Sequence, residues 1–156
     1  FTIRPETMAS AVINGCKAKY SYTGKQIKPL IQVVWNGKVL KNNTDYTLLY
    51  KNNKKRGAAG IIVSAKGNYS GTLTASFTIV RASVKKASVT GLKAVYARTG
   101  KAVKPKVTVK LGGKKLKKKR DYILSYRKNK KKGTALLYVK GVGNYSGTKK
   151  MKFKIR

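Results

Sequence analysis

The chain repeats itself at an offset of 76 residues, and the two copies align without a gap. The shared residues lie mainly in turn-forming segments, with Asp45-Tyr46 returning as Asp121-Tyr122 and segment 67–72 returning as 143–148. The opening residues 1–3 match 77–79, which end the first copy. An internal repeat indicates a tandem of similar folded modules. We therefore expect the last strand of a preceding repeat at 1–3, a first repeat at 4–80 and a second at 81–156.

Within each copy, apolar residues recur at every second position, which is typical of β-strands. Segments 106–111 and 150–156 both alternate in this way. Turn signals separate such segments, as in Asn36-Gly37 and its counterpart Gly112-Gly113. The pattern predicts an all-β fold of two tandem small antiparallel β-sandwich (Ig-like) repeats of 76 residues. The expected strands, each recurring 76 residues later, lie near 11–16, 30–35, 38–41, 46–51, 58–65 and 73–80.

The motif Tyr-x-x-Thr-Gly-Lys-x-(Ile/Val)-x-Pro begins at Tyr20 and again at Tyr96. Together with Gly-Asn-Tyr-Ser-Gly-Thr and a closing Phe-x-Ile, it resembles the tandem Ig-like repeats of secreted and cell-wall-attached proteins of Gram-positive, largely anaerobic bacteria. The resemblance implies a secreted or cell-surface location and no shared catalytic site. Since segment 1–5 lacks the features of a signal peptide, we expect the chain to be a piece of a longer protein.

The chain carries 38 Lys and Arg, three acids and no His, a formal net charge of +35. Its acids are Glu6, Asp45 and Asp121, which do not supply the paired groups that general acid–base catalysis needs. One cysteine and three scattered acids do not supply a metal site either. We therefore expect no enzyme activity, no cofactor and no metal, and a strongly anionic partner.

The charge is divided unevenly between the copies. Residues 1–80 hold 12 Lys and Arg and two acids, a net +10, whereas 81–156 hold 26 and one acid, a net +25. The added cations occupy turns or outward strand positions, as where Thr74, Ser76 and Thr78 correspond to lysines. The candidate polyanion-binding residues form three groups: Lys114, Lys115, Lys117, Lys118, Lys119 and Arg120; then Arg127, Lys128, Lys130, Lys131 and Lys132; then the stripe Lys150, Lys152 and Lys154, continued by Arg156. The first two groups flank one predicted strand, so we expect them at its opposite ends.

Lysines outnumber arginines by 31 to 7, which favours diffuse contacts with many charges over bidentate recognition. We expect multivalent binding by counterion release, with a steep salt dependence. Uncompensated charge destabilises a fold by self-repulsion, so binding explains this surface better than solubility does. The leading hypothesis is that a monomer, without membrane insertion, is retained on the cell wall by teichoic and lipoteichoic acids.

Three alternatives remain open. Extracellular nucleic acid offers the same phosphates, and an acidic polysaccharide such as pectin or mucin offers carboxylates or sulfates. A structural stalk would explain the repetition but not the +25 of the second copy. Trp35 is a candidate sugar platform, but its counterpart is Leu111, which favours a core or edge-strand role.

Other conspicuous residues are predicted to be structural. Tyrosines that recur in both copies, such as Tyr50 and Tyr126, are expected to pack in the core or in turns. Asp45 and Asp121 each precede a strand, where a carboxylate accepts backbone N–H bonds in a turn. Cys16 aligns with Leu92, which predicts a small core hydrophobe.

Overall fold

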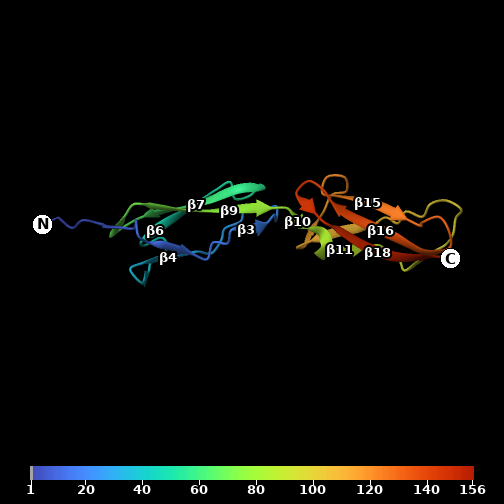
Figure 1. Cartoon of the computed structure of the whole chain (residues 1–156), viewed down its shortest axis with the longest axis horizontal. Coiled ribbons are helices and arrows are strands. Elements are labelled where there is room, and N and C mark those ends of the chain that lie inside the picture. Colours follow the sequence, from blue (N-terminus) through green and yellow to red (C-terminus); the bar gives the residue numbers. More distant parts are fainter. Residues whose placement is uncertain (1) are drawn as a thin grey trace. The chain divides into compact units, whose positions relative to one another are not determined.

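The computed structural model describes residues 2–156, and the chain divides into two compact units, Phe1–Val80 and Arg81–Arg156 (Figure 1). The regular elements of both units are β-strands apart from one 3-10 turn, and residues 2–156 contain no α-helix. The same set of sheets occurs in each unit. The all-β, two-repeat sandwich expected from the sequence is therefore confirmed.

Unit 1 contains a four-stranded sheet in the order β3-β9-β7-β6, a three-stranded sheet in the order β2-β4-β5, and a short pair, β1-β8. The four-stranded sheet is antiparallel apart from the parallel pair β3-β9. The strands within residues 2–80 are β1 Glu6–Thr7, β2 Val12–Asn14, β3 Lys19–Ser21, β4 Gln32–Trp35, β5 Lys38–Val39, β6 Tyr46–Lys51, β7 Gly57–Ala65, β8 Tyr69–Ser70 and β9 Thr72–Val80.

Unit 2 repeats this arrangement with the sheets β12-β18-β16-β15, β11-β13-β14 and β10-β17. A 3-10 turn at Val84–Lys86 follows β10. The strands are β10 Ala82–Ser83, β11 Ser88–Thr90, β12 Val95–Tyr96, β13 Thr108–Leu111, β14 Lys114–Lys115, β15 Tyr122–Arg127, β16 Gly133–Gly141, β17 Tyr145–Ser146 and β18 Thr148–Ile155.

The core of each unit is built by the inward residues of its strands. In unit 1, Val33 of β4 and Ile61 of β7 belong to one buried cluster, so the two larger sheets pack face to face as a sandwich. In unit 2, Phe153 and Ile155 of β18 are 2% and 1% exposed. The Tyr96 ring meets Phe153 edge-on at 5.4 Å between centroids, a preferred aromatic geometry. Burial of these apolar side chains is the main stabilising contribution.

Two-residue turns determine the register of the three-stranded sheets. Asn36 and Gly37 have φ angles of 46° and 76°, and they connect Trp35 to Lys38. Gly112 and Gly113, with φ angles of 55° and 75°, do the same between β13 and β14. Positive φ at both central residues fits the twist of a hairpin and favours Asn and Gly. The predicted turns are confirmed.

The main predicted strands are confirmed with shifted ends, but several short strands were missed. These are β1, β3 and β8 with their counterparts in unit 2. Strand β3 runs parallel to β9, with Tyr20 opposite Ile79. Because residues alternate between faces in both strand directions, the sequence pattern does not reveal which pairs are parallel. Segment 67–72 connects β7 to β9 as the predicted turn, and its Tyr69–Ser70 also pairs with β1.

The strand expected at 1–3 would pair within a preceding repeat, so this expectation stays a prediction. Phe1 lies outside the described residues, and Thr2 and Ile3 belong to no strand. Ile3 is 78% exposed. A strand requires a hydrogen-bonded neighbour, and neither residue pairs with a strand within residues 2–156.

The loop after β6 is held by Asn53, which is 6% exposed. The Asn53 side-chain Nδ2 donates to the Ile27 carbonyl at 3.0 Å, and the Asn53 main-chain carbonyl accepts the Ile27 N–H at 2.7 Å. Asn129 holds Val103 in the same way in unit 2, with distances of 2.9 and 2.7 Å. These hydrogen bonds therefore hold the loops that carry Lys54 and Lys130 against the rest of their units.

We predict that Asn53→Ala lowers the free energy of unfolding of unit 1 by about 1–3 kcal/mol, because it leaves a carbonyl near the core without its donor. The chain has one tryptophan, Trp35, which lies in unit 1. Trp fluorescence during urea denaturation therefore reports unit 1 separately. The exposed Lys54→Ala is the control and should change the value by less than about 0.5 kcal/mol. Equal effects of the two substitutions would contradict the anchoring role of Asn53.

Candidate polyanion-binding surface

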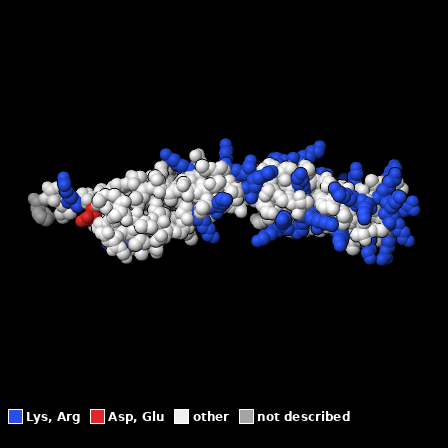
Figure 2. Space-filling model, in the orientation of Figure 1, with Lys and Arg blue, Asp and Glu red and all other residues white. Residues whose placement is uncertain are grey.

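Every candidate lysine and arginine named from the sequence lies exposed on unit 2. Figure 2 shows basic side chains spread over the visible face of this unit, whereas large areas of unit 1 carry none. The uneven distribution of charge in the sequence is therefore also a difference between two molecular surfaces.

The stripe Lys150, Lys152 and Lys154 lies on the outward face of β18. The residues between them, Met151 and Phe153, are half-buried and buried against the core. Alternate residues of a strand point to the same face and are spaced by about 7 Å. The stripe is thus a row of cations whose backbone positions are regularly spaced.

The sheet register joins this stripe to residues of two neighbouring strands. Lys150 lies opposite Tyr138 of β16, and Tyr138 lies opposite Ser125 of β15. Leu136 of β16 lies between Arg127 of β15 and Lys152 of β18. Residues that face each other across an antiparallel pair share one face of the sheet. We call this surface the basic sheet face; its charged, polar and aromatic members are Ser125, Arg127, Tyr138, Lys140, Lys150, Lys152 and Lys154, and Leu136 lies among them.

Sequence reasoning missed part of the basic sheet face. The sequence pattern groups Arg127 with the following loop and does not single out Lys140 and Tyr138. A signal for both residues is present in the sequence, because Lys140 corresponds to Ser64 of unit 1 and Tyr138 corresponds to Ile62. Comparison of the copies along β7 and β16 would have shown both changes.

The other two basic groups flank β15, as the sequence predicts. Lys117, Lys118 and Lys119 precede the strand, and the loop with Lys128 and Lys130 follows it. Lys119 and Lys128 have φ angles of 71° and 55°, so the chain turns sharply on either side of the strand. The sequence therefore placed these two groups correctly at opposite ends of β15.

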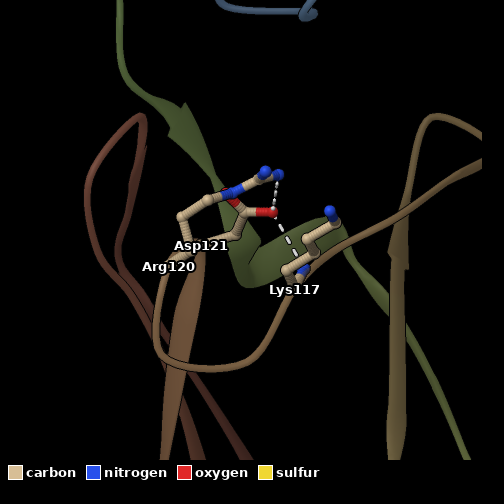
Figure 3. A network of polar contacts seen from close by, with 3 residues as sticks. All are labelled: Lys117, Arg120 and Asp121. Atoms are coloured by element: carbon tan, nitrogen blue, oxygen red, sulfur yellow. Dashed lines mark hydrogen bonds and ion pairs between the residues drawn. The ribbon is translucent and has the colours of Figure 1, made fainter.

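Arg120 differs from its neighbours because it contacts Asp121, which is 3% exposed (Figure 3). Arg120 Nε donates to Asp121 Oδ1 and its NH2 group to Oδ2, each at 2.9 Å. The Lys117 N–H donates to the same Oδ2 at 2.8 Å. The hydrogen bonds from Arg120, followed by the bond from Lys117, lower the pKa of the Asp121 carboxyl despite its burial. Arg120 therefore helps to hold its own turn together.

The predicted structural role of both aspartates is confirmed. In unit 1, Asp45 Oδ2 accepts the Lys41 N–H at 2.7 Å, the same contact that Lys117 makes in unit 2. The Asp45 and Asp121 N–H groups donate back to the carbonyls of Lys41 and Lys117, each at 2.8 Å. Each aspartate thus closes the turn that precedes the first long strand of its sheet.

Trp35 and Cys16 also have packing roles. The Trp35 indole N–H donates to the Thr7 carbonyl at 2.9 Å, and its ring meets Tyr69 edge-on at 5.5 Å. Cys16 is half-buried against the core of unit 1, and this burial raises the pKa of its thiol. A raised pKa disfavours the thiolate, the reactive form. Neither residue needs a binding or catalytic role to explain its position.

The recurring tyrosines pack as predicted. Tyr46 and Tyr122 are 3% and 4% exposed. The Tyr50 hydroxyl donates to the Pro29 carbonyl at 3.1 Å, and the Tyr126 hydroxyl makes the equivalent bond in unit 2 at 2.7 Å. The buried rings of Tyr46 and Tyr122 and the hydroxyl bonds of the half-buried Tyr50 and Tyr126 both stabilise the fold.

Comparison of the chain with protein-family models, with curated proteins and with solved structures finds no match. No helix within residues 2–156 is long and apolar enough to cross a membrane. Among the described residues, there is also no group of three or more His, Cys, Asp or Glu side chains that could bind a metal ion. The proposal for function therefore rests on the fold and on the distribution of charge.

We predict that Asp121→Asn lowers the stability of unit 2 by about 1–3 kcal/mol at pH 7, because it weakens the charged hydrogen bonds to Arg120. The folded pKa of Asp121 lies below its unfolded value of about 4, so the carboxylate contributes its stabilisation above pH 4 and loses it as the pH falls further. The difference between variant and parent should therefore shrink below pH 4 in thermal denaturation followed by circular dichroism.

Other effects of pH on this stability difference are small. The chain has three acidic side chains, and protonating all of them changes a net charge of +35 by only three. General electrostatic repulsion thus changes little over this range. A stability difference that is the same at pH 7 and at pH 2 would contradict the role of the Asp121 charge.

Proposed function

We propose that this chain is a non-catalytic surface module of a larger secreted protein, which holds an anionic polymer of the cell envelope through multivalent lysine contacts. Teichoic acid, with its repeated phosphates, is the first candidate. The proposal depends mainly on one observation: the outward face of β18 carries Lys150, Lys152 and Lys154 where β9 carries Thr74, Ser76 and Thr78. The fold tolerates neutral residues at these positions, so the lysines are not needed for packing.

The charge of the basic sheet face is not neutralised by acids of its own unit. Asp121 is the one acid within 81–156, and it is bonded to Arg120 at the turn before β15. The lysines therefore repel one another through the solvent, which opposes folding. A bound polyanion removes this repulsion and releases its own counterions, so both effects favour binding.

The arrangement of the cations supports an extended ligand. A row of lysines on one strand face, spaced by about 7 Å along the backbone, contacts successive charges of a linear polymer better than a single compact anion. The groups on either side of β15 provide further contacts for a flexible chain. The resemblance to Ig-like repeats of Gram-positive surface proteins supports the cell wall as the location, with unit 1 as a less charged spacer.

Unit 1 supplies the substitutions for a test. We predict that the triple variant Lys150→Thr, Lys152→Ser and Lys154→Thr binds purified Gram-positive cell walls at least tenfold more weakly at about 0.1 M salt. Each lost phosphate contact should reduce the slope of log K against log salt concentration by about 0.7–0.9, so the slope should fall by about two to three. Sedimentation of the full chain with the walls across a NaCl series measures both quantities.

The matched control removes three exposed lysines from unit 1, as Lys51→Ala, Lys54→Ala and Lys55→Ala. It changes the net charge by the same amount and should weaken binding much less. Equal losses would show that net charge, and not the basic sheet face, determines binding. Binding that withstands high salt, or that persists on walls stripped of teichoic acid, would contradict the proposal.

A further inference from the structure

The basic sheet face has an aromatic residue at its centre. Tyr138 lies between Lys150 on β18 and Ser125 on β15, and the Arg127 guanidinium carbon is 5.8 Å from the centre of the Tyr138 ring. Its neighbours in sequence, Leu137 and Val139, are fully buried, so Tyr138 projects to the outer side of the sheet. Unlike the tyrosines that recur in both units, Tyr138 corresponds to Ile62 in unit 1.

A shallow hollow of about 230 Å³ lies beside this ring. Its lining combines small, cationic and aromatic side chains: Ser125, Arg127, Tyr138, Lys140 and Thr148. The unit 1 residue that corresponds to Ser125 is Leu49, which is 55% exposed. In unit 2, the small serine leaves space next to Tyr138, and cations occupy the surroundings of that space.

Binding of a polyanion by charge alone does not require an aromatic ring beside a hollow. Tyrosine and arginine both stack on the flat faces of nucleobases, and such stacking stabilises single-stranded complexes. A row of lysines alongside then contacts the phosphates. The hollow at Tyr138, with Lys150 in the adjacent position and Lys152 one step further, combines both requirements on one sheet face.

We propose that the basic sheet face binds single-stranded nucleic acid, with one base stacked against the pair formed by the Tyr138 ring and the Arg127 guanidinium over it, and with neighbouring phosphates on Lys150 and Lys152. The lysine contacts rest on the proposed function, whereas the base contact is additional to it. In a duplex the bases are stacked inside the helix and do not reach Tyr138. Counterion release alone favours the duplex, since its charge density is higher. A preference for the single strand therefore reports the stacking contact.

Fluorescence anisotropy of the full chain with labelled probes tests this inference. The probes are a 20-nucleotide oligo(dT), an abasic strand with the same number of phosphates, a 20-base-pair duplex and polyglycerol phosphate. The parent chain should bind oligo(dT) at least fivefold more tightly than the abasic strand. Tyr138→Ile, which introduces the unit 1 residue, should abolish this difference and change the affinity for the duplex and for polyglycerol phosphate by less than twofold.

Tyr138→Phe retains the ring and should retain the preference for oligo(dT), whereas the slope of log K against log salt concentration should be unchanged in both variants. Equal affinity of the parent for oligo(dT) and the abasic strand would overturn the stacking contact but not the lysine contacts. Loss of affinity for all probes in Tyr138→Ile would assign Tyr138 a structural role and also overturn the inference.

Two further outcomes separate this inference from others. If the Lys150→Thr, Lys152→Ser and Lys154→Thr variant binds every probe like the parent, the proposed function itself fails. Polygalacturonate serves as a fifth probe. If it binds more tightly than oligo(dT), and Tyr138→Ile removes that advantage, the ligand group that stacks on Tyr138 is a sugar and the assignment to nucleic acid is wrong.

Discussion

The alternation of side chains between the two faces of the β-strands is the constraint on which the rest of each unit depends. In β9 and β18, the inward residues Phe77 and Phe153 are 3% and 2% exposed and pack edge-on against tyrosines at 5.2 and 5.4 Å. The outward residues contact solvent and take no part in this packing. Because the pleat separates the two sets, the core can stay constant while the surface changes from Thr and Ser to Lys.

Charge is the second constraint, and its cost depends on where the cations lie. Lysines on an outward face stay hydrated, and the high dielectric constant of water weakens their mutual repulsion. The interior offers no such screening, and Asp121, which is 3% exposed, is accompanied by Arg120 and a backbone N–H. The fold therefore uses its scarce carboxylate to close a turn, and leaves the lysines of the basic sheet face available to an external anion.

Much of the fold and part of the candidate site could be predicted from the sequence. The hairpin at Asn36-Gly37 and the turn aspartates were predictable because each is a local feature with a local physical cause. The parallel strands β3 and β12 were not, since a three-residue strand such as Lys19–Ser21 has too few residues to show a period. Comparison of the copies shows that Tyr138 stands where unit 1 has Ile62, but the sequence does not show that Lys150 and Ser125 of other strands lie beside it.

The sequence by itself determined the repeat, the alternating core and the difference of +10 against +25 between the copies, since these are properties of spacing and composition. Only the tertiary structure decided which cations share a surface. Arg127 and Lys150 are far apart in the chain, and the register β15-β16-β18 brings both close to Tyr138. Lys150 lies directly opposite Tyr138, and Arg127 lies one row away, opposite Leu136. Register depends on hydrogen bonds and packing between strands, which alternation along any one strand does not contain.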